Sequence, residues 1–115
     1  MKQVINDGTG FVNQVLLKGF VSNKLELMQR SNDGTFFTVI LLSTSSSEND
    51  IQVHRVVVVG DKAKEVVERI KTGNTIFVDG TLHTRAFEDE FYNTRFITEI
   101  LMLEGRMVDD NTVEA

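Results

Sequence analysis

The fold is decided by residues 53–87, which read VHRVVVVGDKAKEVVERIKTGNTIFVDGTLHTRAF. Two runs rich in strand-forming residues enclose a segment whose apolar side chains recur at the i, i+3, i+4 and i+7 positions of one helical face: Ala63, Val66, Val67 and Ile70. This segment is the one helix that the sequence predicts. Asp61 is its expected N-cap and Gly73 its expected C-terminal stop, with Lys71 in the last turn, where the helix dipole favours a cation.

Strands are predicted on both sides of this helix. Segments rich in Val, Ile, Phe, Thr and Leu, which suit a pleated strand, are separated by turns that contain Gly, Asn or Ser. The predicted strands are 12–30 (long and bent), 35–43, 51–59, 75–86 and 95–104. Three strands, a helix and a two-stranded hairpin are the order of an oligonucleotide-binding (OB) barrel. We therefore expect an all-β protein, a five-stranded OB-fold barrel with one α-helix between the third and fourth strands.

The length of the chain, 115 residues, suits one domain with a single core. We expect an N-terminal extension over 1–11, the OB-fold domain over 12–105 and a short acidic C-terminal tail over 106–115. The longest apolar runs are only four residues long, whereas a membrane-spanning helix needs roughly 18, so no membrane segment is predicted. The first residues carry no signal-peptide or transit-peptide pattern.

Sequence patterns typical of catalysis and of metal binding are missing. The chain has no cysteine and only two histidines, His54 and His83, and it has none of the common zinc, phosphate-loop, nucleophile-elbow or dinucleotide motifs. The acidic run Glu88-Asp89-Glu90 is interpreted as a solvated hairpin tip. We therefore predict no catalytic residue, no metal site and no cofactor, and we do not expect an enzyme.

The net charge of −5 disfavours a polyanionic partner only if the charge is evenly spread, and it is not. Residues 1–60 carry five basic and five acidic side chains, whereas residues 61–115 carry seven basic and twelve acidic ones. A surface that binds nucleic acid must therefore be local.

Strand parity predicts which side chains face outward, because successive residues of a strand point to opposite faces. The expected inward sets are Val15, Leu17 and Val21 in the first strand and Ile76, Val78 and Leu82 in the fourth. Lys18 then lies beside Phe20 on the outer face, and Arg85 lies beside Phe87. Aromatic rings that stack on bases, next to cations that contact phosphates, are typical of single-strand binding. The alternative is that each outward ring covers a neighbouring side chain or a subunit contact.

Two segments, VHRVVVVG (residues 53–60) and GNTIFVDGTLHTRAF (residues 73–87), closely resemble the bacterial and mitochondrial single-stranded DNA-binding protein family. The resemblance extends to VNQVLLKG (12–19), the turn NDG (32–34) and RFITEI (95–100), so it covers about residues 12–104. It implies an OB barrel that assembles as a homotetramer and binds single-stranded DNA in DNA replication, recombination and repair. It also implies a cytoplasmic or nucleoid location in a bacterium, or else the matrix of a mitochondrion or plastid.

The resemblance assigns roles to individual residues. His54 matches a family histidine at the subunit contact, Phe87 a stacking aromatic, and Arg55, Arg85 and Lys18 cations near the bound strand. The chain departs from the family at stacking positions: Val53 replaces a tryptophan, Val59 replaces an aromatic, and no tryptophan occurs near Ser47 or anywhere else. The Ser45–Asp50 loop is also shorter than the corresponding family loop.

The sequence-based hypothesis is a homo-oligomer, tetramer or dimer, that binds single-stranded DNA without sequence preference. Its expected phosphate contacts are Lys18, Arg55, Lys71 and Arg85, and its expected stacking residues are Phe87, Phe20 and Tyr92. The alternative is an RNA-binding or protein-interaction subunit of a larger replication or RNA-processing assembly with weak DNA binding. It is supported by the strand at 35–43, where Phe36 and Ile40 fall on one face while Phe37 and Val39 fall on the other, so that both faces are apolar.

Overall fold

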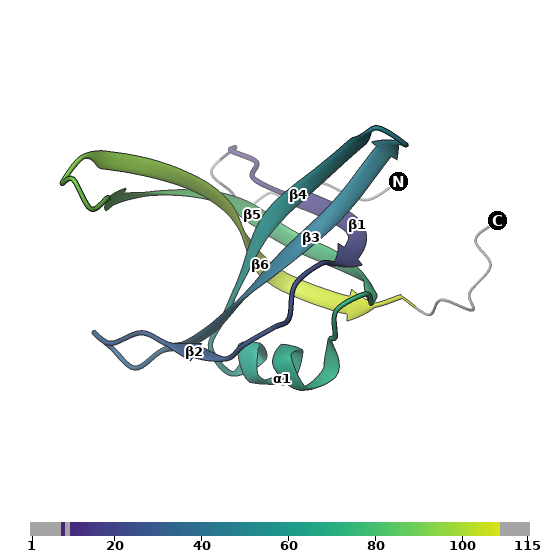
Figure 1. Cartoon of the computed structure of the whole chain (residues 1–115), viewed down its shortest axis with the longest axis horizontal. Helices are drawn as coiled ribbons and strands as arrows, with labels where there is room; N and C mark the ends of the chain where they lie inside the picture. Colours follow the sequence, from purple (N-terminus) through teal and green to yellow (C-terminus); the bar gives the residue numbers. More distant parts are fainter. Residues whose placement is uncertain (1–7, 9, 109–115) are drawn as a thin grey trace.

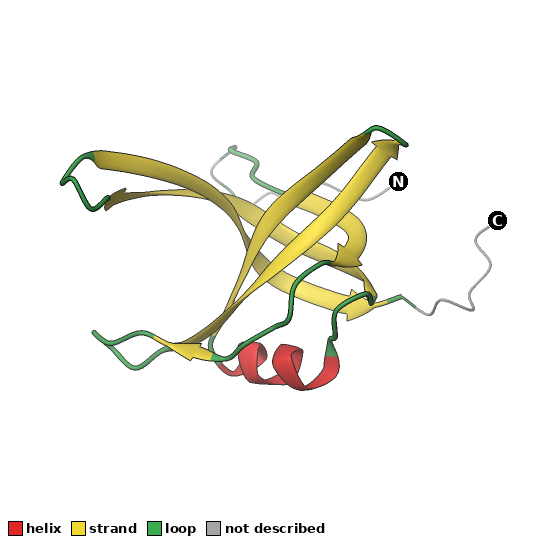
Figure 2. Cartoon of the chain, in the orientation of Figure 1, coloured by secondary structure: helices red, strands yellow, loops and turns green. Residues whose placement is uncertain are grey.

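The computed structural model describes residues 8 and 10–108. In this part of the chain the elements are β1 (Val15–Val21), β2 (Met28–Gln29), β3 (Phe36–Ser47), β4 (Asp50–Val59), α1 (Asp61–Arg69), β5 (Thr75–Glu88) and β6 (Thr94–Met107). Figure 2 shows the strands wrapped into a barrel with α1 below one end. This order confirms the predicted all-β OB-fold barrel with a helix between the β3–β4 and β5–β6 hairpins.

The first predicted strand, 12–30, is wrong in its middle, because β1 ends at Val21 and the chain resumes pairing only in β2. The side chain of Asn23 takes the place of strand pairing there: its Oδ1 accepts a hydrogen bond from the Leu41 amide (2.8 Å) and its Nδ2 donates to the Val39 carbonyl (2.9 Å). Leu25 turns into the core, where it is 8% exposed. The Asn23 side chain thus makes the hydrogen bonds to the β3 backbone that a paired strand would otherwise make.

The barrel closes through the pairing of β1 with both β5 and β3. The sheet order is β1-β5-β6-β4-β3-β2, and β4 runs parallel to β6 for only two pairs, Val56 with Ile100 and Val57 with Leu101. The pairing of β5 with β6 shifts between Asp79 and Gly80. A side chain at Gly80 would overlap the Leu101 carbonyl, so glycine permits this close approach of the two strands.

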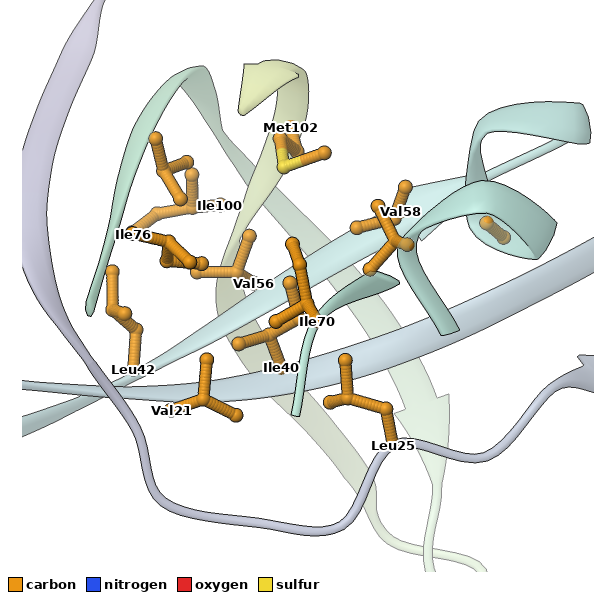
Figure 3. Packing of buried hydrophobic residues seen from close by; sticks show 13 residues of the cluster. Val21, Leu25, Ile40, Leu42, Val56, Val58, Ile70, Ile76, Ile100 and Met102 are labelled. Carbon is orange, nitrogen blue, oxygen red and sulfur yellow. The ribbon is translucent and has the colours of Figure 1, made fainter. Parts of the chain in front are cut away.

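The core fills the barrel from the inward faces of the strands and from α1, as Figure 3 shows. Its members are Val21, Leu25, Ile40, Leu42, Val56, Val58, Ala63, Val66, Ile70, Ile76, Val78, Ile100 and Met102. Predicted parity is confirmed along β1 and at Ile76 and Val78. Leu82, predicted to face inward, shares the core face with its partner Ile100 but is 53% exposed, because it lies beyond Gly80, the last residue of β5 that pairs with β1.

Both predicted ends of the helix are wrong. Gly60, at φ 80°, occupies the N-cap position without a side-chain cap, and Asp61 is the first helical residue. The helix stops at Arg69, because Ile70 is extended and packs into the core, so Lys71 and Gly73 lie in the loop beyond it. The burial of Ile70 therefore ends the helix before Lys71 and Gly73, the residues that the sequence predicts at its C-terminus.

Two hairpins extend past the barrel and diverge (Figure 1). The β3–β4 arm pairs as far as Ser47 with Asp50, so the predicted Ser45–Asp50 loop is mostly strand. The β5–β6 arm, residues 81–100, pairs as far as Glu88 with Thr94. Within the part of the chain that the structure describes, no helix has the length and apolar character to cross a bilayer.

Candidate nucleic-acid interface

Two arginines from different arms share one carboxylate at the point where the arms diverge. Arg55 Nε on β4 donates to Glu99 Oε2 on β6 (2.7 Å), and Arg85 Nε on β5 donates to Glu99 Oε1 (2.7 Å). The strand register explains this contact. Glu99 pairs with His83 on β5, two residues before Arg85. The next residue, Ile100, pairs on β4 with Val56, the neighbour of Arg55. The structure therefore brings together two of the predicted phosphate-binding residues.

The electrostatics of this cluster keep Glu99 ionised. Burial, which leaves Glu99 7% exposed, raises the pKa of its carboxyl, but the hydrogen bonds and charges of Arg85 and Arg55 outweigh it, so the pKa lies below its ordinary value. One carboxylate between two guanidinium groups leaves a net positive charge. The arginine side chains are 35% and 44% exposed, and neither guanidinium makes another hydrogen bond to a described residue. Their terminal nitrogens remain available to an anion.

Aromatic and cationic side chains alternate along the same face of the β5–β6 arm. Phe87 lies two residues beyond Arg85 on β5, so both point to the same side, and Phe87 pairs with Arg95 on β6. The Phe87 ring is 42% exposed. Arg95 Nε donates to Asp89 Oδ2 (2.9 Å) at the hairpin turn, where Tyr92 is 84% exposed. The predicted site residues Phe87 and Tyr92 thus lie beside the arginine cluster and at the arm's tip, respectively.

Phe20 lies farther along the same outer surface. It pairs with Ser43 on β3, which pairs with Val53 on β4, so the three side chains form one row across the sheet. Phe20 is 47% exposed and lies about 10 Å from Val53 at the usual strand spacing. Val53 precedes Arg55 by two residues on the same face, so Phe20 and the arginine cluster belong to one continuous surface.

Lys18 lies at the far end of this surface, two residues from Phe20 on the outward face of β1, and Lys71 lies off it. Lys18 pairs with Phe77, eight residues before Arg85 on β5, which is about 26 Å along an extended strand. Lys71 follows α1, and its Nζ donates to the Val67 carbonyl (3.3 Å). Their predicted phosphate contacts therefore require a nucleic acid to extend from the arms toward the helical end of the barrel.

His54 lies on the β3–β4 arm with its ring partly buried. Its Nε2 is 2.8 Å from Thr44 Oγ1, a hydrogen bond between adjacent strands of the arm. The predicted role of His54 at a subunit contact concerns a second chain, and it stays a prediction.

Sequence reasoning missed Glu99, which holds the two arginines, and the exposed rings of Phe91 (73%) and Phe96 (73%). Phe91 is at the tip of the β5–β6 arm, and Phe96 pairs with Ala86 on the face opposite Phe87. The available signal for Glu99 was an acid directly before the apolar run Ile100–Leu103 of the same strand. Among the residues that the structure describes, no group of three or more histidine, cysteine or acidic side chains is arranged to hold a metal ion.

Two comparisons with known proteins found relatives of this chain. A model of the single-strand binding protein family matches residues 12–108. A curated relative, single-stranded DNA-binding protein 1 of Xylella fastidiosa (strain 9a5c), is 38% identical over 74 residues, which cover 61% of this chain and 54% of that protein. The chain therefore spans about half the length of this relative.

Proposed function

Because this chain belongs to the single-strand binding protein family, we propose that it binds single-stranded DNA without sequence preference. The name of its Xylella relative describes the same ligand. The observation that supports the proposal is the contact of Arg55 and Arg85, from two separate arms, with one buried carboxylate, beside the half-exposed ring of Phe87.

This surface suits an unpaired strand by its chemistry. Guanidinium groups bind phosphate through paired N–H donors, and a ring such as Phe87 stacks on a base for about 1 to 3 kcal/mol. Every base has a flat aromatic face, so stacking is tolerant of sequence. A paired duplex hides its bases in the helix and offers this surface only phosphates.

Fewer stacking rings than is usual in the family mean weaker binding. Val53, 58% exposed, lies where the family has a tryptophan, and a valine has no ring for a base to stack on. Phe20, in the same row as Val53, is the substitute platform on this surface. We infer an affinity several kcal/mol below that of a member with all stacking rings, at about 1 to 3 kcal/mol per ring.

Within this proposal, the cellular roles are DNA replication, recombination and repair, and the acting form is a homo-oligomer with His54 at or near a subunit contact. No catalytic step is assigned. The alternative, a protein-interaction or RNA-binding subunit, is supported by the outer face of β3, where Phe37, Val39 and Leu41 are apolar and partly buried.

The test is a titration of the protein with labelled oligothymidine and with a duplex of equal length, each at two salt concentrations. We expect preference for the single strand and an affinity that falls as salt rises. Arg85→Gln should lower the affinity and reduce the slope of log K against log salt by about 0.7, the value for one phosphate contact on a single strand. Arg69→Gln, on α1 and away from the arms, is the matched control and should leave the slope unchanged.

Equal binding of single strand and duplex, or no binding to either, would reject the proposed function. Preference for oligouridine over oligothymidine would instead favour the RNA-binding alternative.

A further inference from the structure

A buried acid at the centre of a surface proposed to bind a polyanion needs an explanation. A carboxylate beside the bound phosphates repels them, and taking it out of water is itself costly. Glu99 is nevertheless 7% exposed and lies between the two arginines that the proposed function places against the strand. Its role must therefore come from what it does to those arginines.

Glu99 is the connection between two strands that are not neighbours. The sheet order places β6 between β4 and β5, so Arg55 and Arg85 lie on opposite sides of the strand that carries Glu99. Each carboxylate oxygen accepts a hydrogen bond from one guanidinium, Oε2 from Arg55 and Oε1 from Arg85. Both carboxylate oxygens are therefore bonded to arginine, one to each arm.

The atoms used in these contacts matter. Both arginines donate through Nε, which lies at the base of the planar guanidinium group, and holding that edge sets the orientation of the whole plane. The terminal nitrogens, the donors that match a phosphate, make no hydrogen bond to another described residue. An arginine held in this way has lost side-chain freedom before the ligand arrives, which lowers the entropic cost of binding.

We propose that Glu99 is a positioning residue for single-stranded DNA: its carboxylate orients Arg55 and Arg85 together so that both guanidinium groups face the phosphates of one bound strand. This inference rests on the proposed function and deepens it. Glu99 itself does not contact the strand. Its benefit is the prior ordering of two cations, and this benefit exceeds the repulsion between its own charge and the phosphates.

The decisive variant is Glu99→Gln, because charge and positioning predict opposite results. Removal of a negative charge by itself tightens the binding of an anion. A glutamine, however, has one oxygen acceptor where the carboxylate has two. Its amide N–H₂ group would face the N–H donor of one of the two arginines, so only the other arginine can be held. We expect the affinity for oligothymidine to fall by roughly threefold to tenfold, which corresponds to the reordering of one or two arginine side chains.

The matched control is Glu88→Gln, which removes the same charge from the same arm. Glu88 is exposed at the end of β5 and makes no ion pair with another described residue. We expect its affinity to be unchanged or slightly higher. If Glu99→Gln binds oligothymidine as tightly as the parent protein or more tightly, the positioning role is refuted. Failure of the parent protein to bind the single strand would instead refute the proposed function, so the two failures are distinguishable.

A double-mutant cycle separates positioning from a loss of folded protein. Arg85→Gln should cost less affinity in the Glu99→Gln background than in the parent, because an arginine that is no longer held contributes less. If Glu99→Gln only unfolded part of the protein, the active fraction would fall but Arg85→Gln would cost the same affinity in both backgrounds. Equal costs in the two backgrounds would contradict the proposal.

Should Glu99→Gln fail to fold, Glu99→Asp provides the same test. It keeps the charge but is one methylene shorter, so it cannot reach both arginines as closely. We expect a weaker affinity at unchanged net charge, and an affinity equal to that of the parent would overturn the inference.

Discussion

Phe87→Ala is the most direct test of where a single strand lies on this barrel. Phe87 is 42% exposed, so part of its side chain is open to a base. Stacking of one base on an aromatic side chain is worth about 1 to 3 kcal/mol, so its removal should weaken binding roughly fivefold to 150-fold. The loss should be similar for different base compositions, because stacking does not read sequence.

Phe96→Ala is the matched control, because it removes the same ring from the same arm but from the opposite face. Phe96 pairs with Ala86, whereas Phe87 pairs with Arg95, and Phe96 is the more exposed of the two at 73%. Fluorescence anisotropy of a labelled oligothymidine, titrated with each variant at one salt concentration, measures both affinities. Unchanged affinity of Phe87→Ala, or an equal loss in Phe96→Ala, would show that the strand does not follow the face that carries Arg85.

Three further predictions concern stability and assembly. Gly80→Ala should destabilise the fold by about 1 to 3 kcal/mol in urea unfolding, because the new methyl group would overlap the Leu101 carbonyl; an unchanged midpoint would contradict this. The pKa of Glu99 is lower in the folded chain than in the unfolded chain, so its ionised carboxylate stabilises the protein at pH values above the unfolded pKa, about 4.3, and this contribution is lost as pH falls through the folded pKa. The difference in unfolding free energy between the parent and Glu99→Gln should therefore shrink on acidification from pH 7 to about 3. A constant difference would refute the assignment. His54→Ala should weaken subunit association in sedimentation, and a parent protein that is monomeric at micromolar concentration would remove the predicted oligomer.

Local sequence patterns predicted the elements because each pattern acts over a few residues. Apolar residues at helical spacing located α1, and strand parity correctly placed Lys18 and Phe20 outward on β1. Parity placed Leu82 on the same face as its core partner Ile100, but period-two alternation does not indicate whether that face is covered, and Leu82 is 53% exposed. The sequence predicts strand over residues 22–27, whereas in the structure the Asn23 side chain replaces ladder bonds by bonding to β3, a partner distant in sequence.

The chain by itself determined the order of elements, the inward and outward faces within the barrel, and the two arginines and the phenylalanine expected to hold a nucleic acid. Only the tertiary structure decided which of these act together. Arg55 and Arg85 are thirty positions apart, and they converge because β6 lies between their strands and presents Glu99 to both. Lys18 and Lys71 carry the same charge yet lie outside this arginine cluster. Strand pairing across a closed barrel sets these distances, and no local pattern encodes them.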